Sequence, residues 1–334
     1  MDNPTAAPFT TRVLDSRKWS PDEARDSQYT ALLPASHRTK RDDIVVPQLD
    51  PEFIKDELSV KRLNAIQDWL WVCGRPMPPR PLHHQVLISR NIAITENPEL
   101  HLVWSGNRIF LKPIPAWLLE PDVWAAHIAP DGEMAKCARG FLFSYAALIA
   151  YESDFRLAME GGLLPLSATW PAWRALAREL LQGHSYAAVN PRYWYGELRL
   201  GRLNKVYRVR QGFVFRGYSS VAAHAVYGDL IRDNFAALAT ILGYVVIVLT
   251  AMQVGLGVER LQADQAFQDV SYGFTVFSII APLIAGAGIM LVVLGVFVSN
   301  WLATKNYEGK RFSEMGVEPY WRNQPEKSPT TSSA

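Results

Sequence analysis

Residues 235–258 read FAALATILGYVVIVLTAMQVGLGV, and residues 274–302 read FTVFSIIAPLIAGAGIMLVVLGVFVSNWL. Neither stretch contains Asp, Glu, Lys, Arg or His. At about 1.5 Å per residue, helices of these lengths exceed the hydrocarbon core of a bilayer, which is about 30 Å thick. The sequence therefore predicts two transmembrane helices, at about 235–258 and 274–302.

The 15 residues between the two spans, 259–273, are few enough to require an antiparallel transmembrane hairpin, which we place over residues 233–303. This loop carries one basic residue and three acids, whereas basic residues gather before the first span and after the second. Because Lys and Arg are enriched on cytosolic flanks, both termini are expected in the cytosol. The N-terminus also lacks the apolar region of a signal peptide. We thus expect a multi-pass integral membrane protein with two spans; span length sorts membranes only weakly, so no particular membrane is predicted.

The rest of the chain has the composition of a folded domain between polar ends. The 334 residues include 34 Lys and Arg against 32 Asp and Glu, a balance that excludes a strongly basic nucleic-acid binder. Residues 1–45 and 304–334 are polar and lack apolar periodicity, so we expect flexible tails there. Residues 46–232 mix helical and strand patterns, which predicts a cytosolic α+β domain ahead of the hairpin.

Apolar spacing and turn residues place the elements of this domain. Asp50 and Pro51 are typical of a helix start, and Gly74 and Gly183 are typical helix ends. β-branched residues around a Ser-Gly-Asn turn at 105–107 predict a small antiparallel sheet, and the apolar run 141–151 predicts a buried core helix. We expect strands within residues 85–95 and 102–112, and helices over about 51–73, 115–127, 135–159 and 173–182.

The patterns that mark common enzyme sites are missing from the sequence. It has no glycine-rich phosphate loop, no His-Glu-x-x-His, no Cys-x-x-Cys and no Gly-x-Ser-x-Gly. The adjacent His83 and His84 would point to opposite faces of a strand, and the two cysteines, Cys73 and Cys137, are expected to be free thiols. We therefore predict no catalytic residue, no metal site and no cofactor, and expect a protein that is not an enzyme.

The proline-rich run RPMPPRP at residues 75–81 is the sharpest local motif. Arg75, Pro78 and Pro81 have the three-residue spacing of a polyproline ligand for an SH3-type groove. A rigid turn packed against neighbouring aromatic residues is the alternative interpretation. Both interpretations assign a role to the same proline residues.

The stretch from Arg192 to Arg216 has seven basic residues and a single acid, Glu197. Its interleaved aromatic residues are of the types that settle at headgroup depth, and basic residues near an anionic leaflet contribute about 1 kcal/mol each. The alternative is a solvated helix face followed by a turn at Gln211. The candidate membrane-surface residues are Arg199, Arg202, Lys205, Arg208 and Arg210.

Several longer strings add a resemblance, among them RLNAIQDWLWVCGRPMPPRPLHHQ (62–85), GFLFSYAALIAYESDFRLA (140–158) and NPRYWYGELRLGRLNKVYR (190–208). Over residues 50–305 the chain resembles an uncharacterised two-span membrane protein family of filamentous fungi, a domain of unknown function. The resemblance implies a soluble domain followed by two spans, with no established activity. Members are sometimes labelled subtilisin-like serine proteases, but the Asp, His and Ser contexts of that triad are missing here.

The order of domain and spans is also similar to that of CorA-type magnesium channels. Those channels carry Gly-Met-Asn at the outer end of the first span, where this chain has Gly255, Leu256 and Gly257. Our leading hypothesis is a membrane-tethered cytosolic binding or adaptor domain. Its expected partners are the lipid bilayer, anionic headgroups and a protein, with no nucleic acid. The alternatives are a CorA-like ion-conducting oligomer and an enzyme with an unrecognised site.

Overall fold

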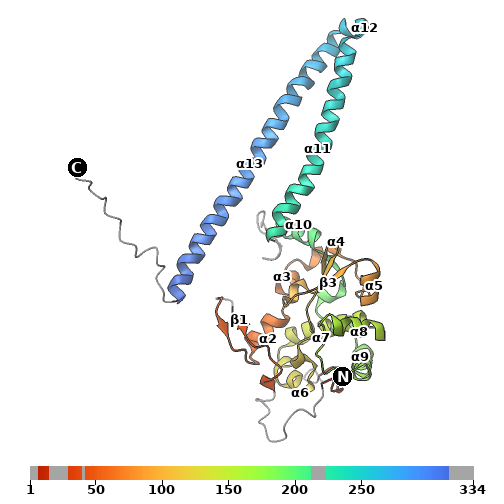
Figure 1. Ribbon diagram of the computed structural model, residues 1–334, viewed down its shortest axis with the longest axis vertical. Helices are drawn as coiled ribbons and strands as arrows, with labels where there is room; N and C mark the ends of the chain where they lie inside the picture. Colours follow the sequence, from red (N-terminus) through yellow and green to blue (C-terminus); the bar gives the residue numbers. More distant parts are fainter. Residues whose placement is uncertain (1–6, 15–28, 40–41, 212–222, 316–334) are drawn as a thin grey trace, which may run out of the picture. The chain divides into compact units, whose positions relative to one another are not determined.

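The fold is described by a computed structural model, which covers residues 7–14, 29–39, 42–211 and 223–315 (Figure 1). The chain divides into two compact units, Met1–Ser219 and Ser220–Ala334. We describe each unit by itself.

The first unit is an α+β domain in which short helices surround a small sheet, as predicted. Its α-helices are α2 (Pro51–Leu58), α3 (Lys61–Asn64), α4 (Leu70–Cys73), α5 (Leu82–Leu87), α6 (Pro121–Val123), α7 (Gly132–Leu148), α8 (Glu152–Glu160), α9 (Trp170–Gln182) and α10 (Leu200–Gln211). Shorter 3-10 segments are η2 (Gln67–Trp69), η3 (Pro98–Leu100), η4 (Ala116–Leu119), η6 (Tyr186–Ala188) and η7 (Pro191–Trp194), and η5 (Trp124–Ile128) is a π-helix.

The sheet has four strands in the order β3 (Asn91–Ile94), β5 (Arg108–Leu111), β4 (Val103–Ser105) and β6 (Leu198–Arg199). The predicted hairpin between β4 and β5 is confirmed, and Gly106 adopts the positive φ of 57° that its turn requires. The prediction of an antiparallel sheet is wrong, because β3 pairs with β5, and β6 with β4, in parallel. The sheet is mixed because β5 inserts between β3 and β4, so β3 lies beside β5 rather than beside β4, the next strand in sequence. A separate antiparallel pair is formed by β1 (His37–Arg38) and β2 (Ile44–Val45).

Tertiary contacts break most of the predicted long helices. The expected helix 51–73 consists of α2, α3, η2 and α4, and a side-chain oxygen of Glu99 accepts from the Arg62 N–H in the first turn of α3 at 2.8 Å. The expected helix 135–159 is divided into α7 and α8, because Asp154 accepts from the N–H groups of Ala150 and Tyr151. Such capping stabilises a new helix start. The expected strand 85–95 begins in the last turn of α5 and contains β3 only at 91–94, and the expected helix 115–127 is η4, α6 and most of η5.

The core of the domain is built around α7, confirming the predicted buried helix. Twelve of its 17 residues are buried, and Gly140 lets the helix approach Tyr193 so closely that a Cβ there would lie 2.2 Å from the tyrosine ring. Trp117, Trp124 and Trp173 are fully buried around it. These three tryptophans thus fill the core, each burying a large apolar area.

Part of the N-terminal segment expected as a tail packs on this domain. Phe9, Val13 and Leu14 are buried, and Arg12 pairs with Glu120 at 2.9 Å and with Asp122 at 2.8 Å. The described residues 7–14 therefore belong to the folded unit.

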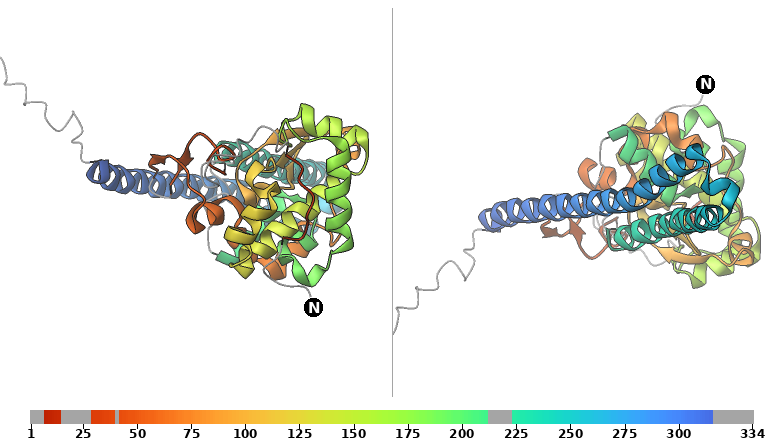
Figure 2. Two further views of the ribbon diagram at one scale, coloured as in Figure 1. Left: turned by 90° about the horizontal axis from the view of Figure 1, so that it is seen from below. Right: turned by 90° about the horizontal axis from the view of Figure 1, so that it is seen from above.

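The second unit is a helix pair, α11 (Ala223–Leu256) and α13 (Gln265–Met315), joined by the short α12 (Glu259–Gln262). The two long helices lie side by side near α12 (Figures 1 and 2). A Cβ on Gly255 would lie 2.6 Å from the Phe267 ring, so a larger residue at this position of α11 would clash with α13. The connection is shorter than the expected loop 259–273, and α13 extends into the segment 304–334 that we expected to be a tail.

Among the described residues, one helical segment is long and apolar enough to cross a membrane: Gln265–Gly288 within α13. The apolar segment of α11 among the described residues is Leu242–Leu256, which is shorter than a membrane span. The structure therefore supports one of the two predicted spans by length and composition, starting nine residues before the expected Phe274.

Candidate functional site

Four of the five predicted membrane-surface residues lie on α10, and Arg199 lies in β6 just before it. Leu203, Val206 and Tyr207 form the buried face of α10. The exposed face carries Arg202, Lys205, Val209 and Arg210. Of Arg208 the structure describes only its position in the helix. The outer face of α10 is thus basic, with one apolar residue, Val209, 77% exposed.

Helix α4 lies beside α10 and adds aromatic residues to the same region. A guanidinium nitrogen of Arg202 donates to the carbonyl oxygen of Val72 at 3.1 Å. The neighbouring Trp71 side chain is exposed, and Trp69 is partly so. Large exposed indoles beside cations are typical of surfaces that contact headgroups.

The proline-rich run folds back on the segment that leads into α10. The Gly196 N–H donates to the Met77 carbonyl oxygen at 2.8 Å, and a Cβ on Gly196 would lie 2.5 Å from the Pro79 nitrogen. Pro79 is buried, Pro78 and Pro81 are half-buried, and Arg75 is exposed. This packing favours the rigid-turn interpretation, although the contact is with Gly196 rather than with tryptophans. The SH3-type ligand stays a prediction.

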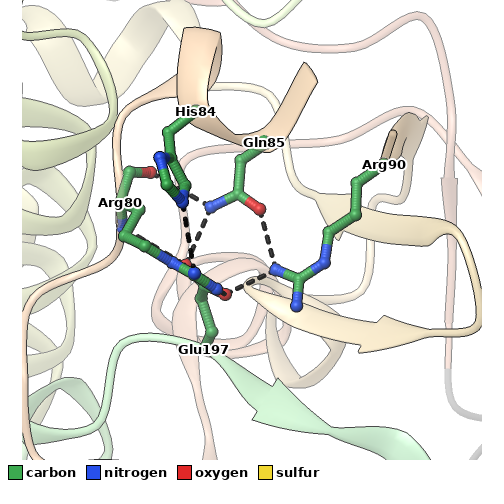
Figure 3. A network of polar contacts seen from close by, with 5 residues as sticks. All are labelled: Arg80, His84, Gln85, Arg90 and Glu197. Carbon is green, nitrogen blue, oxygen red and sulfur yellow. Dashed lines mark hydrogen bonds and ion pairs between the residues drawn. The ribbon is translucent and has the colours of Figure 1, made fainter. Parts of the chain in front are cut away.

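A network of polar contacts around Glu197 joins these segments (Figure 3). Arg80 donates from Nε to one carboxylate oxygen at 2.9 Å and from a terminal nitrogen to the other at 2.7 Å. The Gln85 amide donates at 2.8 Å, and Arg90 contacts both the carboxylate and the Gln85 side-chain oxygen. Two arginines and a glutamine from the region of α5 are thus fastened to one carboxylate, three residues before α10 begins.

The electrostatics of the network favour the ionised carboxylate. Burial of Glu197 by itself would raise its pKa, but hydrogen bonds from Arg80, Arg90 and Gln85 outweigh burial and lower the pKa to about 2. The Arg90 guanidinium also lies 4.3 Å from the centre of the Trp104 ring, and that of Arg199 lies 5.2 Å from it. Arg199, predicted as a lipid contact, therefore also packs on the sheet.

The two adjacent histidines lie on α5 rather than on the predicted strand, and they have different partners. His83 Nδ1 lies 2.8 Å from Asp154, whose carboxylate also caps α8. His84 Nε2 lies 3.2 Å from a terminal nitrogen of Arg80. Among the described residues, no group of three or more His, Cys, Asp or Glu side chains is placed to hold a metal ion.

A serine and a histidine meet in the core in a way that at first suggests a nucleophile and its base. His101 Nε2 lies 2.9 Å from Ser144 Oγ, but the Ser144 hydroxyl donates to the Phe141 carbonyl at 2.6 Å. His101 Nδ1 accepts the Lys112 N–H, so Nε2 carries the proton and donates to the serine. Both side chains are 1% exposed, and burial is the main cause that lowers the His101 pKa. This geometry is that of a satisfied core contact.

The fold defines a class of protein in which an α+β domain is followed by a pair of apolar helices. Residues 50–282 match the family of unknown function DUF6601, so the chain belongs to that family. No curated protein and no solved structure matches the chain. The family match ends within α13, before residue 305, where the resemblance inferred from the sequence ends. It confirms that resemblance in part: the family is described as one of unknown function, and the description mentions neither fungi nor a membrane.

Proposed function

We propose that the protein is an integral membrane protein in which α11 and α13 form a two-span anchor. Its α+β domain is a cytosolic, non-catalytic binding domain that rests on the anionic surface of the bilayer, with both termini on that side. The observation that carries this proposal is the outer face of α10, where basic side chains and the exposed Val209 share the surface of the helix that precedes the anchor in sequence.

The exposure of the apolar helices supports the anchor. Few residues of Gln265–Gly288 are buried, so this segment is not the core helix of a folded domain. On α11, Tyr244 and Ile247 are each 67% exposed. Apolar patches of this extent need a cover, and lipid supplies it for both helices. Residues 235–256 of α11 contain no charged side chain, so the uncharged part of the helix begins before Leu242 and reaches the length of a span.

Few residues separate α10 from the proposed anchor in the sequence. The 11 residues 212–222 separate α10 from α11, and a fully extended chain of this length reaches about 40 Å at most. Arg202, Lys205 and Val209 occur at i, i+3 and i+7 and so share one side of α10. Because each basic residue at an anionic surface contributes about 1 kcal/mol, two or three such contacts suffice to hold a tethered domain.

The test places an environment-sensitive fluorophore on a Val209→Cys variant of the full chain in lipid nanodiscs. Cys73 and Cys137 are buried, and burial raises their pKa to about 11 and about 12, so the new thiol is labelled selectively. We expect a blue-shifted emission in discs with anionic lipid and not in neutral discs. Reversing Arg202 and Lys205 to Glu should remove the shift.

The matched control reverses Arg174, an exposed residue of α9, which should leave the shift unchanged. High salt should act like the Arg202 and Lys205 reversals, because it screens exposed charges. Emission that is the same in neutral and anionic discs would contradict docking through the basic face.

A further inference from the structure

A groove of about 530 Å³ opens on the first unit where the C-terminal end of α7 packs against α9. Its apolar lining includes Ala146, Ile149 and Ala177, together with the indoles of Trp170 and Trp173. Trp173 is fully buried, and its Nε1–H donates to the Ile149 carbonyl oxygen at 3.3 Å, which fixes this part of the lining. Because alanine side chains end at Cβ, they leave space beside the large indoles. The volume is within the range of about 300–1,000 Å³ that is typical of small-molecule sites.

The charged part of the lining is purely basic. Arg174 and Arg178 line the groove and are exposed, and no Asp or Glu does so. In the part of the chain that the structure describes, neither guanidinium pairs with a carboxylate. Glu179 is the one acid of α9, and it is engaged elsewhere: it accepts from the Thr10 hydroxyl at 3.2 Å and from the Thr11 hydroxyl.

The spacing of the two arginines indicates an anion. Residues at i and i+4 share one side of a helix, and two like charges at this spacing destabilise it unless a counter-charge lies between them. A guanidinium group binds a carboxylate through two parallel N–H donors, so two neighbouring arginines can hold one acid group. The Arg174 guanidinium also lies 6.0 Å from the centre of the Trp170 ring, which places cation and aromatic ring together in the groove.

From this geometry we infer that the groove binds a small organic acid with a flat apolar body, of which an aromatic carboxylate is the simplest example. The apolar body lies against Trp170 and the alanines, and the acid group accepts from Arg174 and Arg178. An inorganic anion would leave the apolar lining uncovered, and an uncharged compound would leave both guanidinium groups without a partner. The groove lies wholly within the first unit, so the inference goes beyond the proposed docking of α10 and does not depend on it.

The test is isothermal titration calorimetry of the full chain in neutral nanodiscs with 2-naphthoate, after subtraction of the heat measured with empty discs. We expect one site per chain. Arg174→Gln and Arg178→Gln should each weaken binding at least about tenfold, because each removes a charge-assisted contact. Wild type should bind 2-naphthamide, which has the same rings without the charge, and acetate, which lacks the rings, at least about tenfold more weakly than 2-naphthoate.

The matched control is Arg156→Gln, at an exposed arginine of α8 that does not line the groove, and it should leave the affinity unchanged. Arg174 and Arg178 are exposed, so their variants should keep the wild-type midpoint in urea. No binding of 2-naphthoate at up to about 1 mM would overturn the inference, as would an affinity that both arginine variants retain. Equal affinity for 2-naphthamide or for acetate would overturn it too.

The reversal of Arg174 separates this inference from the docking of the domain. In anionic discs that variant should keep the emission shift of the label on Val209→Cys, and in neutral discs it should lose 2-naphthoate. Each proposal can therefore fail while the other stands.

Discussion

Replacing Glu197 with Gln tests whether its network holds the α5 and α10 regions together. The lowering of the Glu197 pKa from the ordinary 4.5 to about 2 corresponds to roughly 3 kcal/mol in favour of the charged form. Partial exposure of Arg80 screens part of this interaction, so we expect a loss of about 2 kcal/mol of unfolding free energy. The variant also leaves Arg90, 9% exposed, without its counter-ion.

The assay is urea unfolding of the full chain in mild detergent, followed by tryptophan fluorescence. Nine of the eleven tryptophans precede residue 219, so the signal reports mainly the first unit. A loss of about 2 kcal/mol lowers the midpoint by about 1 M urea. Glu152→Gln is the matched control, because Glu152 forms an exposed pair with Arg156 at 2.8 Å and should contribute less than about 0.5 kcal/mol.

The dependence on pH gives an independent check. A carboxyl group whose pKa is lower in the folded state stabilises fully above its unfolded pKa, and this stabilisation disappears as the pH falls through the folded pKa. The difference between wild type and Glu197→Gln should therefore be constant above about pH 5.5 and shrink between pH 4.5 and 2. Equal midpoints at neutral pH, or a difference that persists unchanged at pH 2, would refute the reasoning.

Two further predictions concern close packing and burial. Gly196→Ala should lower the unfolding free energy by about 1–3 kcal/mol in the same urea assay, because the new Cβ would lie 2.5 Å from the Pro79 nitrogen. Gly132→Ala is the control: its new Cβ has nothing within 4 Å, so this change should not destabilise the domain. Cys73 and Cys137 should react slowly with a maleimide at neutral pH and rapidly in urea, as measured by intact mass. The reason is that both thiols are buried and burial raises their pKa to about 11 and about 12. Rapid modification of the folded chain would contradict the burial of these thiols.

The elements that the sequence predicted correctly are those specified by nearby residues. The β4–β5 hairpin depends on a glycine at its turn, and α9 combines an apolar stripe with Gly183 as its C-cap. The buried helix α7 is evident from its continuous apolar run. In each case the local pattern and the tertiary environment favour the same structure.

The errors arise where a distant residue decides the local structure. Glu99 stabilises the start of α3 from 37 positions away. The parallel pairing of β3 with β5 likewise depends on the placement of a strand and not on its composition.

The sequence predicted separate parts of the candidate site, but not the contact that joins them. The basic residues of α10 and the proline-rich run were both singled out, but Glu197 joins them through Arg80, 117 positions earlier. Its only signal in the sequence was that it is the single acid in a basic stretch.

The N-terminal segment that packs on the domain has a consequence for synthesis. Residues 10–12 leave the ribosome early, yet Arg12 pairs with Glu120, 108 positions later, and Thr10 pairs with Glu179, 169 positions later. At about 5–20 residues per second, this last partner appears roughly 8–34 s after the segment that contacts it. During that interval the apolar side chains of Phe9 and Val13 lack part of the surface that buries them, and a ribosome-bound chaperone can hold them.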